Sequence, residues 1–305
     1  MIKVNALNRY YGDLTAIENL SFEVKNNQVV GFLGLNGAGK STTLKILAGL
    51  LSPSGGSVQI YGKDLLTAPA SFRKNIGYLP EDAPLYEDMT VSSFLTYLAQ
   101  LRGLPSEDIQ YRIPVVIQKC QLRGMENRLI EELSLGYKKR VGIAQAIIHH
   151  PRLVILDEPI SGLDPKQIVE MREVIRNLTK EAIVLLSSHN LNEIAETCDR
   201  LLVLHEGKLV AQGTTDVLLN ERTQTSYNVE ATLVHQNSNL DEILDIPSVL
   251  SCEITHSGDT SITKLSLSST PEDIVEHLVK NGIGVRSITT SVGELEQLFL
   301  SLTQK

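Results

Sequence analysis

Short apolar runs alternate with segments of helical periodicity along the first two thirds of the chain. Four of the runs are almost continuously apolar: residues 29–33, 153–156, 183–186 and 201–204. Runs of this kind are typical of strands that a parallel sheet buries on both faces. Further strands are predicted at residues 2–7, 21–24 and 57–61. Helical patterns lie between the strands, at residues 40–49, 167–179 and 190–198. The alternation predicts an α/β fold built on a parallel sheet.

Two regions depart from this alternation. Residues 91–102 and 109–122 have helical patterns on either side of Gly103-Leu104-Pro105, so a mostly helical insert is predicted over about residues 82–140. After residue 219 the composition becomes more acidic, and residues 221–226 form a polar stretch that suits a linker. The chain is therefore predicted to hold two domains, residues 1–219 and a small α+β domain of residues 220–305.

The second predicted domain has the element order βαββαβ, which indicates a split βαβ unit. Its strands are predicted at residues 227–234, 249–256, 263–267 and 285–289, and a weak helix near residues 240–244. A second helix begins at Pro271, with Thr270 as its cap and Gly282 after its end. A last helix is predicted with four apolar residues on one face: Leu295, Leu298, Phe299 and Leu302.

Composition and charge narrow the function classes. The 305 residues are 42% hydrophobic and 21% charged, which excludes a disordered or fibrous chain. The net charge of −8 disfavours generic binding of nucleic acid, which depends on clustered Lys and Arg. The three cysteines, Cys120, Cys198 and Cys252, lie far apart in the sequence, so they indicate neither a disulfide framework nor a metal-binding pair. This pattern fits a protein of the reducing cytoplasm. No apolar stretch suits a membrane span or a signal peptide, so a cytosolic location is expected, with membrane contact through a partner.

A phosphate-binding motif follows the apolar run at residues 29–33. It fits the pattern G-x-x-x-x-G-K-[ST], and its residues are Gly34, Leu35, Asn36, Gly37, Ala38, Gly39, Lys40 and Ser41. Thr42 follows directly and belongs to the same candidate site. Backbone N–H groups of such a loop point at phosphate oxygens, and the following helix favours anions at its N-terminus. Lys40 is expected to contact the β- and γ-phosphates, and the Ser41 hydroxyl to bind Mg²⁺. The alternative is a Gly-rich turn with a surface lysine.

Two carboxylates end the apolar run at residues 153–156. Ligands of a parallel sheet bind at the carboxyl ends of its strands, so Asp157 is placed to hold Mg²⁺ beside the phosphates. Glu158 could polarise an attacking water as general base. Taken alone, the pair could equally be solvated acids at a strand end, but the phosphate loop favours the catalytic interpretation.

The chain resembles the ATP-binding subunits of ATP-binding cassette (ABC) transporters over about residues 1–219. The most discriminating element is Leu133-Ser134-Leu135-Gly136-Tyr137, which matches the family signature L-S-G-G-Q at three of its five places. The resemblance implies that Ser134 and Gly136 contact the γ-phosphate of ATP held by the other subunit. Leu135 and Tyr137 depart from the pattern. On residue type alone, Ser134 is also an ordinary helix cap.

Three further matches follow the order of the family. Tyr11 corresponds to the aromatic residue that stacks on adenine, although Tyr10 beside it leaves the choice open. Asp164 ends Ser161-Gly162-Leu163-Asp164, which resembles the nucleotide-contacting loop that crosses the dimer interface. His189 resembles the switch histidine that touches the γ-phosphate and joins Glu158 and Lys40 as a catalytic candidate.

Glu81 stands where most of the family has a glutamine that binds Mg²⁺ and senses the membrane partner. A carboxylate oxygen can also bind a hard cation, so Glu81 joins Ser41 and Asp157 as a metal-ligand candidate. With the segment that follows it, Glu81 resembles bacterial exporter subunits of the drug-resistance and gliding-motility type, which also carry a C-terminal accessory domain. The alternative is a solvated loop acid.

The expected function is an ATPase that uses ATP and Mg²⁺, dimerises around two nucleotides and drives export through a separate membrane permease. The second cassette would be another copy of this chain or a different cassette subunit, and no nucleic acid is expected as a partner. The expected location is cytoplasmic, on the inner face of the membrane through the permease. The alternatives are a soluble cassette ATPase acting on ribosomes or DNA, and a regulatory module that binds nucleotide without turnover.

Overall fold

The chain forms two compact units, Met1–Thr215 and Asp216–Lys305. A computed structural model describes residues 1–65, 67, 72–220, 227–234, 243, 246–257, 260–268, 271–280 and 283–290. The division into domains of residues 1–219 and 220–305 stays a prediction.

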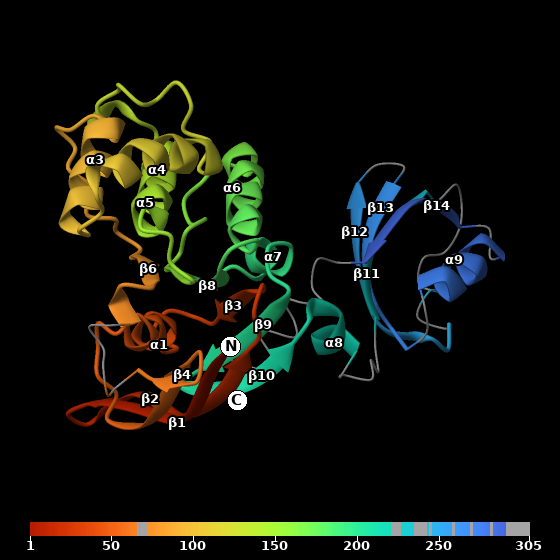
Figure 1. Cartoon of the computed structure of the whole chain (residues 1–305). Helices are drawn as coiled ribbons and strands as arrows, with labels where there is room; N and C mark the ends of the chain where they lie inside the picture. Colours follow the sequence, from red (N-terminus) through yellow and green to blue (C-terminus); the bar gives the residue numbers. More distant parts are fainter. Residues whose placement is uncertain are drawn as a thin grey trace. The chain divides into compact units, whose positions relative to one another are not determined.

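A six-stranded sheet forms the centre of the first unit, in the order β10-β9-β3-β8-β7-β6 (Figure 1). Its strands are β3 (Val29–Leu33), β6 (Ile76–Leu79), β7 (Leu153–Leu156), β8 (Ile183–Ser188), β9 (Arg200–His205) and β10 (Lys208–Gly213). All neighbouring strands in this sheet are parallel except β9 and β10, which pair antiparallel. Strands β3, β7 and β8 are buried at every position, so the apolar runs are buried parallel strands, as predicted.

A second sheet is antiparallel, in the order β2-β1-β4-β5. Its strands are β1 (Ile2–Tyr11), β2 (Leu14–Val24), β4 (Gly55–Ile60) and β5 (Lys63–Asp64). Strands β1 and β2 are longer than predicted because register shifts interrupt their pairing and break the alternation. The irregular backbone includes Ala6 and Asn19, both with positive φ.

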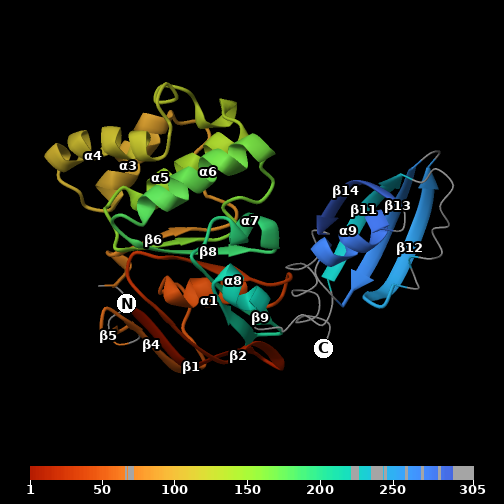
Figure 2. The same cartoon turned by 90° about the vertical axis from the view of Figure 1, so that its right-hand side faces the viewer.

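Helix α1 (Lys40–Leu47) lies between the two sheets in both views (Figures 1 and 2). Its Leu44, Ile46 and Leu47 belong to an apolar core that includes residues of both sheets, among them Phe22 and Phe32. The rings of these two phenylalanines meet edge to face with centroids 5.5 Å apart. This packing holds the start of α1 in place directly after β3 and the phosphate-loop motif.

The predicted helical insert contains α3 (Val91–Leu101), α4 (Ser106–Lys119), η1 (Ile130–Glu132) and the start of α5 (Leu135–Ile147). Two further helices, α6 (Pro165–Leu178) and α7 (Leu191–Ala195), contact β8 of the central sheet. Thr90 caps α3 through its hydroxyl. Helix α4 begins earlier than predicted because Pro105 occupies its cap position and two acids complement its first turn. Helix α1 ends at Leu47, shortly before Gly49, whose φ of 69° does not continue a helix.

The second unit contains a four-stranded antiparallel sheet in the order β12-β13-β11-β14, which is the strand order of a split βαβ unit. Its elements are β11 (Tyr227–Val234), β12 (Val249–Ser257), β13 (Thr260–Leu267), α9 (Pro271–Lys280) and β14 (Gly284–Thr290), and α8 (Thr215–Asn220) precedes them. Ile274 and Leu278 of α9 lie in one core with Val229, Leu233 and Leu265 of the sheet. The predicted linker, most of the weak helix and the last helix lie outside the described residues.

Of the three cysteines, Cys120 is buried, and Cys198 and Cys252 are half-buried. In the part of the chain that the structure describes, no helix combines the length and the apolar character that crossing a membrane requires.

Gly77 on β6 allows close contact between this strand and α5. A Cβ atom at Gly77 would lie 2.1 Å from the carbonyl oxygen of Ala146. Because backbone is the obstacle, an added methyl group must push the helix and the strand apart. Glu81 follows two residues after the end of the same strand.

We expect Gly77→Ala to lower the free energy of unfolding by about 1–3 kcal/mol, the usual cost of overpacking a core. The measurement is urea denaturation followed by circular dichroism. Gly55→Ala is the matched control, because its Cβ would meet nothing closer than Asn8 at 3.8 Å. Equal stability of the two variants would contradict the close packing of β6 on α5.

Candidate functional site

The phosphate-loop motif forms a tight turn between β3 and α1. Gly39 caps α1 with φ 97°, and a Cβ atom there would lie 2.6 Å from the carbonyl oxygen of Ala16. Only glycine fits this combination of backbone angle and close approach. The N-terminus of α1 consequently opens onto the space above the loop, where its dipole favours an anion.

A cavity of about 280 Å³ lies at this turn. It is lined by Tyr11, Leu14, Thr15, Ala16, Asn36, Gly37, Ala38, Gly39, Lys40, Ser41, Thr42, Glu81 and Glu158. Most of the predicted ligand-binding residues therefore meet at one place. Gly34 and Leu35 contribute differently, because their carbonyl oxygens accept hydrogen bonds from Lys40 at 2.8 and 3.3 Å.

The Lys40 ammonium is enclosed by acceptors. Besides the two loop carbonyls, it lies 3.7 Å from Oε1 of Glu158, and the side chains of both residues are 6% exposed. Burial lowers the pKa of Lys40, and the carboxylates of Glu158, Asp157 and Glu81 oppose that shift. The site thus concentrates a cation and several anions in a poorly solvated space, where their interactions are strong.

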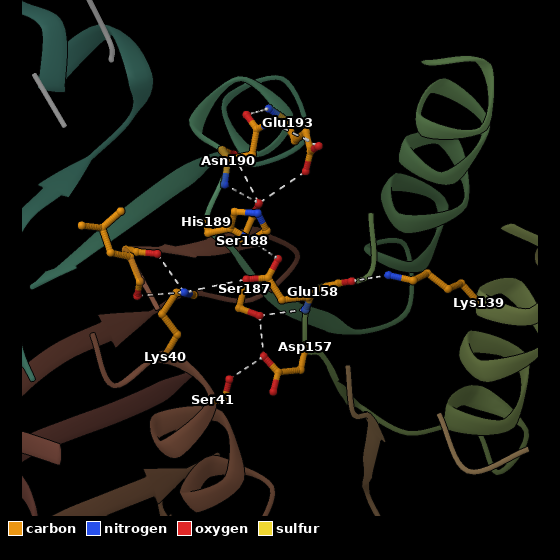
Figure 3. A network of polar contacts seen from close by, with 12 residues as sticks. Lys40, Ser41, Lys139, Asp157, Glu158, Ser187, Ser188, His189, Asn190 and Glu193 are labelled. Atoms are coloured by element: carbon orange, nitrogen blue, oxygen red, sulfur yellow. Dashed lines mark hydrogen bonds and ion pairs between the residues drawn. The ribbon is translucent and has the colours of Figure 1, made fainter. Parts of the chain in front are cut away.

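Asp157 is joined to two hydroxyl groups at the carboxyl end of β7 (Figure 3). Its Oδ1 accepts from Ser41 Oγ at 3.1 Å and from Ser187 Oγ at 2.6 Å, and the residue is only 3% exposed. Carboxylate and hydroxyl oxygens suit Mg²⁺, which keeps several of its waters and needs few protein ligands. The described residues contain no cluster of three or more His, Cys, Asp or Glu able to hold a metal by themselves.

Glu158 is in contact with His189 as well as with Lys40. Its Oε2 lies 3.0 Å from Nδ1 of His189, so the two predicted catalytic groups come from neighbouring strand ends and meet directly. Figure 3 shows Glu158 between Lys40 and His189. A buried carboxylate facing both an ammonium and an imidazole is well placed to handle a proton beside phosphates.

The backbone of Glu158 has φ 49°, a conformation that costs a non-glycine residue about 1–3 kcal/mol. Side chains of other residues hold both the N–H and the carbonyl group of Glu158. Its N–H donates to Ser187 Oγ at 2.8 Å, and its carbonyl accepts from Lys139 Nζ at 2.7 Å. Burial lowers the pKa of Lys139, with Glu158 as the largest opposing charge. Neither Ser187 nor Lys139 was predicted from the sequence. The sequence marks Ser187 only as a serine near the end of a buried strand, and Lys139 only as a lysine shortly after the signature.

Tyr11 and Tyr10 have different surroundings, although both are exposed. Tyr11 lines the cavity, and the guanidinium of Arg9 lies 4.4 Å from its ring centroid. The hydroxyl of Tyr10 hydrogen-bonds Oδ1 of Asn8 at 3.2 Å, and Tyr10 is not among the lining residues. The geometry therefore favours Tyr11 over Tyr10 as the aromatic residue beside a bound ligand.

The signature residues do not line the cavity. Ser134 caps α5, Asp164 caps α6 by accepting from the Gln167 N–H at 2.9 Å, and Gly136 is packed against the Gln167 side chain. A Cβ atom at Gly136 would lie 2.7 Å from Cδ of that glutamine. These three predicted residues therefore gather at the N-termini of α5 and α6, apart from the cavity of the same chain.

Comparisons with known proteins agree with the fold and the site. The family model for the ABC transporter matches residues 17–161. The uncharacterized ABC transporter ATP-binding protein YxlF of Bacillus subtilis is 32% identical over 99% of both chains. The bacitracin transport ATP-binding protein BcrA of Bacillus licheniformis is 34% identical over 99% of this chain and 97% of its own. A solved ATP-binding subunit of an ABC transporter has a TM-score of 0.64 and 34% identity, over 72% of this chain and 92% of the other.

The chain is similar to these relatives along almost their whole length. Together with the phosphate loop and the paired acids, this similarity favours a transport ATPase over a soluble cassette ATPase that acts on ribosomes or DNA. The chain belongs to the ABC transporter family as an ATP-binding subunit, a Mg²⁺-dependent ATPase whose hydrolysis of ATP is coupled to transport.

Proposed function

We propose that ATP binds in the cavity at residues 34–42 and that Glu158 is the general base for its hydrolysis. The observation that supports this most directly is the contact network that joins Lys40, Glu158 and His189 at the edge of that cavity. A buried acid with these two neighbours can accept a proton from a water that attacks the γ-phosphate. Tyr11, stacked on Arg9, offers its other ring face to adenine.

Ser41, Asp157 and Glu81 are proposed to hold Mg²⁺, directly or through water. The bound ion supplies positive charge beside the β- and γ-phosphates. Lys40 is proposed to exchange its loop carbonyls for phosphate oxygens, and His189 to hold Glu158 while contacting the γ-phosphate. The loop N–H groups orient the phosphates, so the protein contributes mainly position and charge.

Ser134, Gly136 and Asp164 are proposed to act on the nucleotide of a second cassette, either another copy of this chain or a different cassette subunit. Their grouping at the N-termini of α5 and α6, away from the cavity of their own chain, supports this assignment. Two helix N-termini side by side also suit a phosphate brought by a partner.

The transport direction is proposed to be export, through a separate membrane permease at the inner face of the membrane, with no nucleic acid as partner. The carboxylate at residue 81 and the similarity to a bacitracin transport subunit support this proposal. ABC ATP-binding subunits work with membrane permeases and dimerise. Co-purification with the membrane fraction, dependent on the permease gene, tests the proposed location.

Lys40→Ala is expected to weaken ATP binding by at least about tenfold, because it removes a charge-assisted contact with phosphate. Equilibrium dialysis with labelled ATP measures the affinity. Lys45→Ala is the matched control, since Lys45 is an exposed lysine on the same helix. Unchanged affinity in Lys40→Ala would remove the assignment of the phosphate loop.

Glu158→Gln is expected to reduce ATP turnover by about 100-fold or more while binding is retained, because the amide keeps the shape but cannot accept the proton. Phosphate release gives the rate, and size-exclusion chromatography with ATP–Mg²⁺ should show a dimer. Glu23→Gln, at an exposed acid on β2, is the control. Turnover at the wild-type rate would show that another group is the base.

Glu81→Ala is expected to raise the Mg²⁺ concentration for half-maximal hydrolysis on the order of tenfold, as for the loss of one charged oxygen contact. Glu81→Gln should have a smaller effect, because the amide still presents an oxygen. Titration of hydrolysis with Mg²⁺ compares the variants, and Asp82→Asn is the neighbouring control. If glutamine is as damaging as alanine, the carboxylate charge has a role beyond presenting an oxygen.

A further inference from the structure

Lys139 makes a contact that none of the proposed chemical steps uses. It belongs to α5, and its Nζ donates to the backbone carbonyl oxygen of Glu158 at 2.7 Å. Figure 3 shows this side chain reaching from its helix toward Glu158, on the side away from Lys40. The contact is made with the backbone of Glu158, and so leaves the carboxylate to Lys40 and His189.

The backbone held by this contact is strained. At φ 49°, Glu158 occupies a left-handed conformation that non-glycine residues adopt only where the surroundings enforce it. Its N–H is fixed by Ser187 Oγ at 2.8 Å, and Ser187 in turn donates to Asp157. Lys139 fixes the carbonyl on the other side. The two contacts together hold the backbone from which the carboxylate of Glu158 extends to Lys40 and His189.

The neighbourhood of Lys139 explains why a lysine is suited to this position. The carboxylates of Glu158, Glu81, Glu193 and Asp82 all act on its ammonium. A cation among these acids balances charge next to a phosphate site, and it also compensates for a carboxylate rather than an amide at residue 81. A lysine therefore supplies both the hydrogen bond and the charge, whereas methionine, an uncharged side chain of similar length, supplies neither.

We propose that Lys139 is the positioning residue of Glu158, holding the general base in its strained backbone conformation from helix α5. This inference rests on the assignment of Glu158 as the base. Helix α5 begins just after Ser134, which is proposed to meet the nucleotide of the second cassette. One rigid helix therefore carries a residue directed at the partner's nucleotide and, a little over one turn later, the residue that holds the base of its own chain.

The test compares Lys139→Met, Lys139→Arg and the matched control Lys138→Met. Lys138 is the preceding residue of the same helix, but its ammonium pairs with Glu87 at 2.6 Å instead of contacting Glu158. The kcat and KM for hydrolysis and the dissociation constant of ATP are measured on the purified full chain, and crystal structures of all three variants are determined.

Lys139→Met is expected to lower kcat by about 100-fold, the effect of a misplaced catalytic group, with KM and ATP affinity within about twofold of the wild type. Lys139→Arg should recover most of the rate, because it restores a charged donor, and Lys138→Met should match the wild type. In the crystal structure of Lys139→Met, Glu158 should leave its positive φ, while it keeps this angle in Lys138→Met.

An unchanged kcat in Lys139→Met, equal losses in the two methionine variants, or a loss confined to ATP affinity would overturn the positioning role. So would a Glu158 backbone that stays at positive φ without Lys139. Failure of the assignment of the base is a different result: Glu158→Gln would then hydrolyse ATP at the wild-type rate, whatever the Lys139 variants do.

Discussion

The parallel pairing of β3, β8 and β7 is the constraint on which the site depends. Parallel neighbours end at the same edge of a sheet, so the segments that follow these three strands meet there, although they are far apart in the sequence. The phosphate loop follows β3, the two acids follow β7, and His189 follows β8. Loss of one strand from this order would separate the lysine, the acids and the histidine.

Burying several charged groups at one edge of the sheet costs free energy, because the groups lose contact with water. Polar partners of each group offset this cost. Asp157 and Glu158 are almost fully buried, yet each has polar partners from at least two other elements. Buried charges are tolerated where hydrogen bonds and opposite charges replace water. The same contacts leave few alternative positions for the side chains, and transition-state stabilisation depends on groups that are positioned in advance.

The helices after β6 extend this arrangement beyond the sheet. Helix α5 is fixed to β6 through the close approach at Gly77 and to the end of β7 through Lys139. Its N-terminus carries the signature residues, which do not line the cavity of their own chain. The packing therefore connects two surfaces of the first unit: the cavity proposed to bind ATP and the helix ends proposed to meet a second cassette.

The amino-acid sequence by itself determined the elements and most of the chemistry, because these depend on local patterns. Continuous apolar runs marked β3, β7 and β8, and the spacing of Gly34, Lys40 and Ser41 identified the phosphate loop before any contact was known. Residue type and position after a strand also indicated Asp157 and Glu158, whereas His189 was expected from its resemblance to the switch histidine of the family. Tertiary structure alone decided what these groups touch: that Glu158 lies between Lys40 and His189, that Tyr11 rather than Tyr10 lines the cavity, and that Ser187 and Lys139 hold a strained backbone. Such contacts join residues from separate strands and helices, and no local pattern encodes a distance between segments that only the packed sheet brings together.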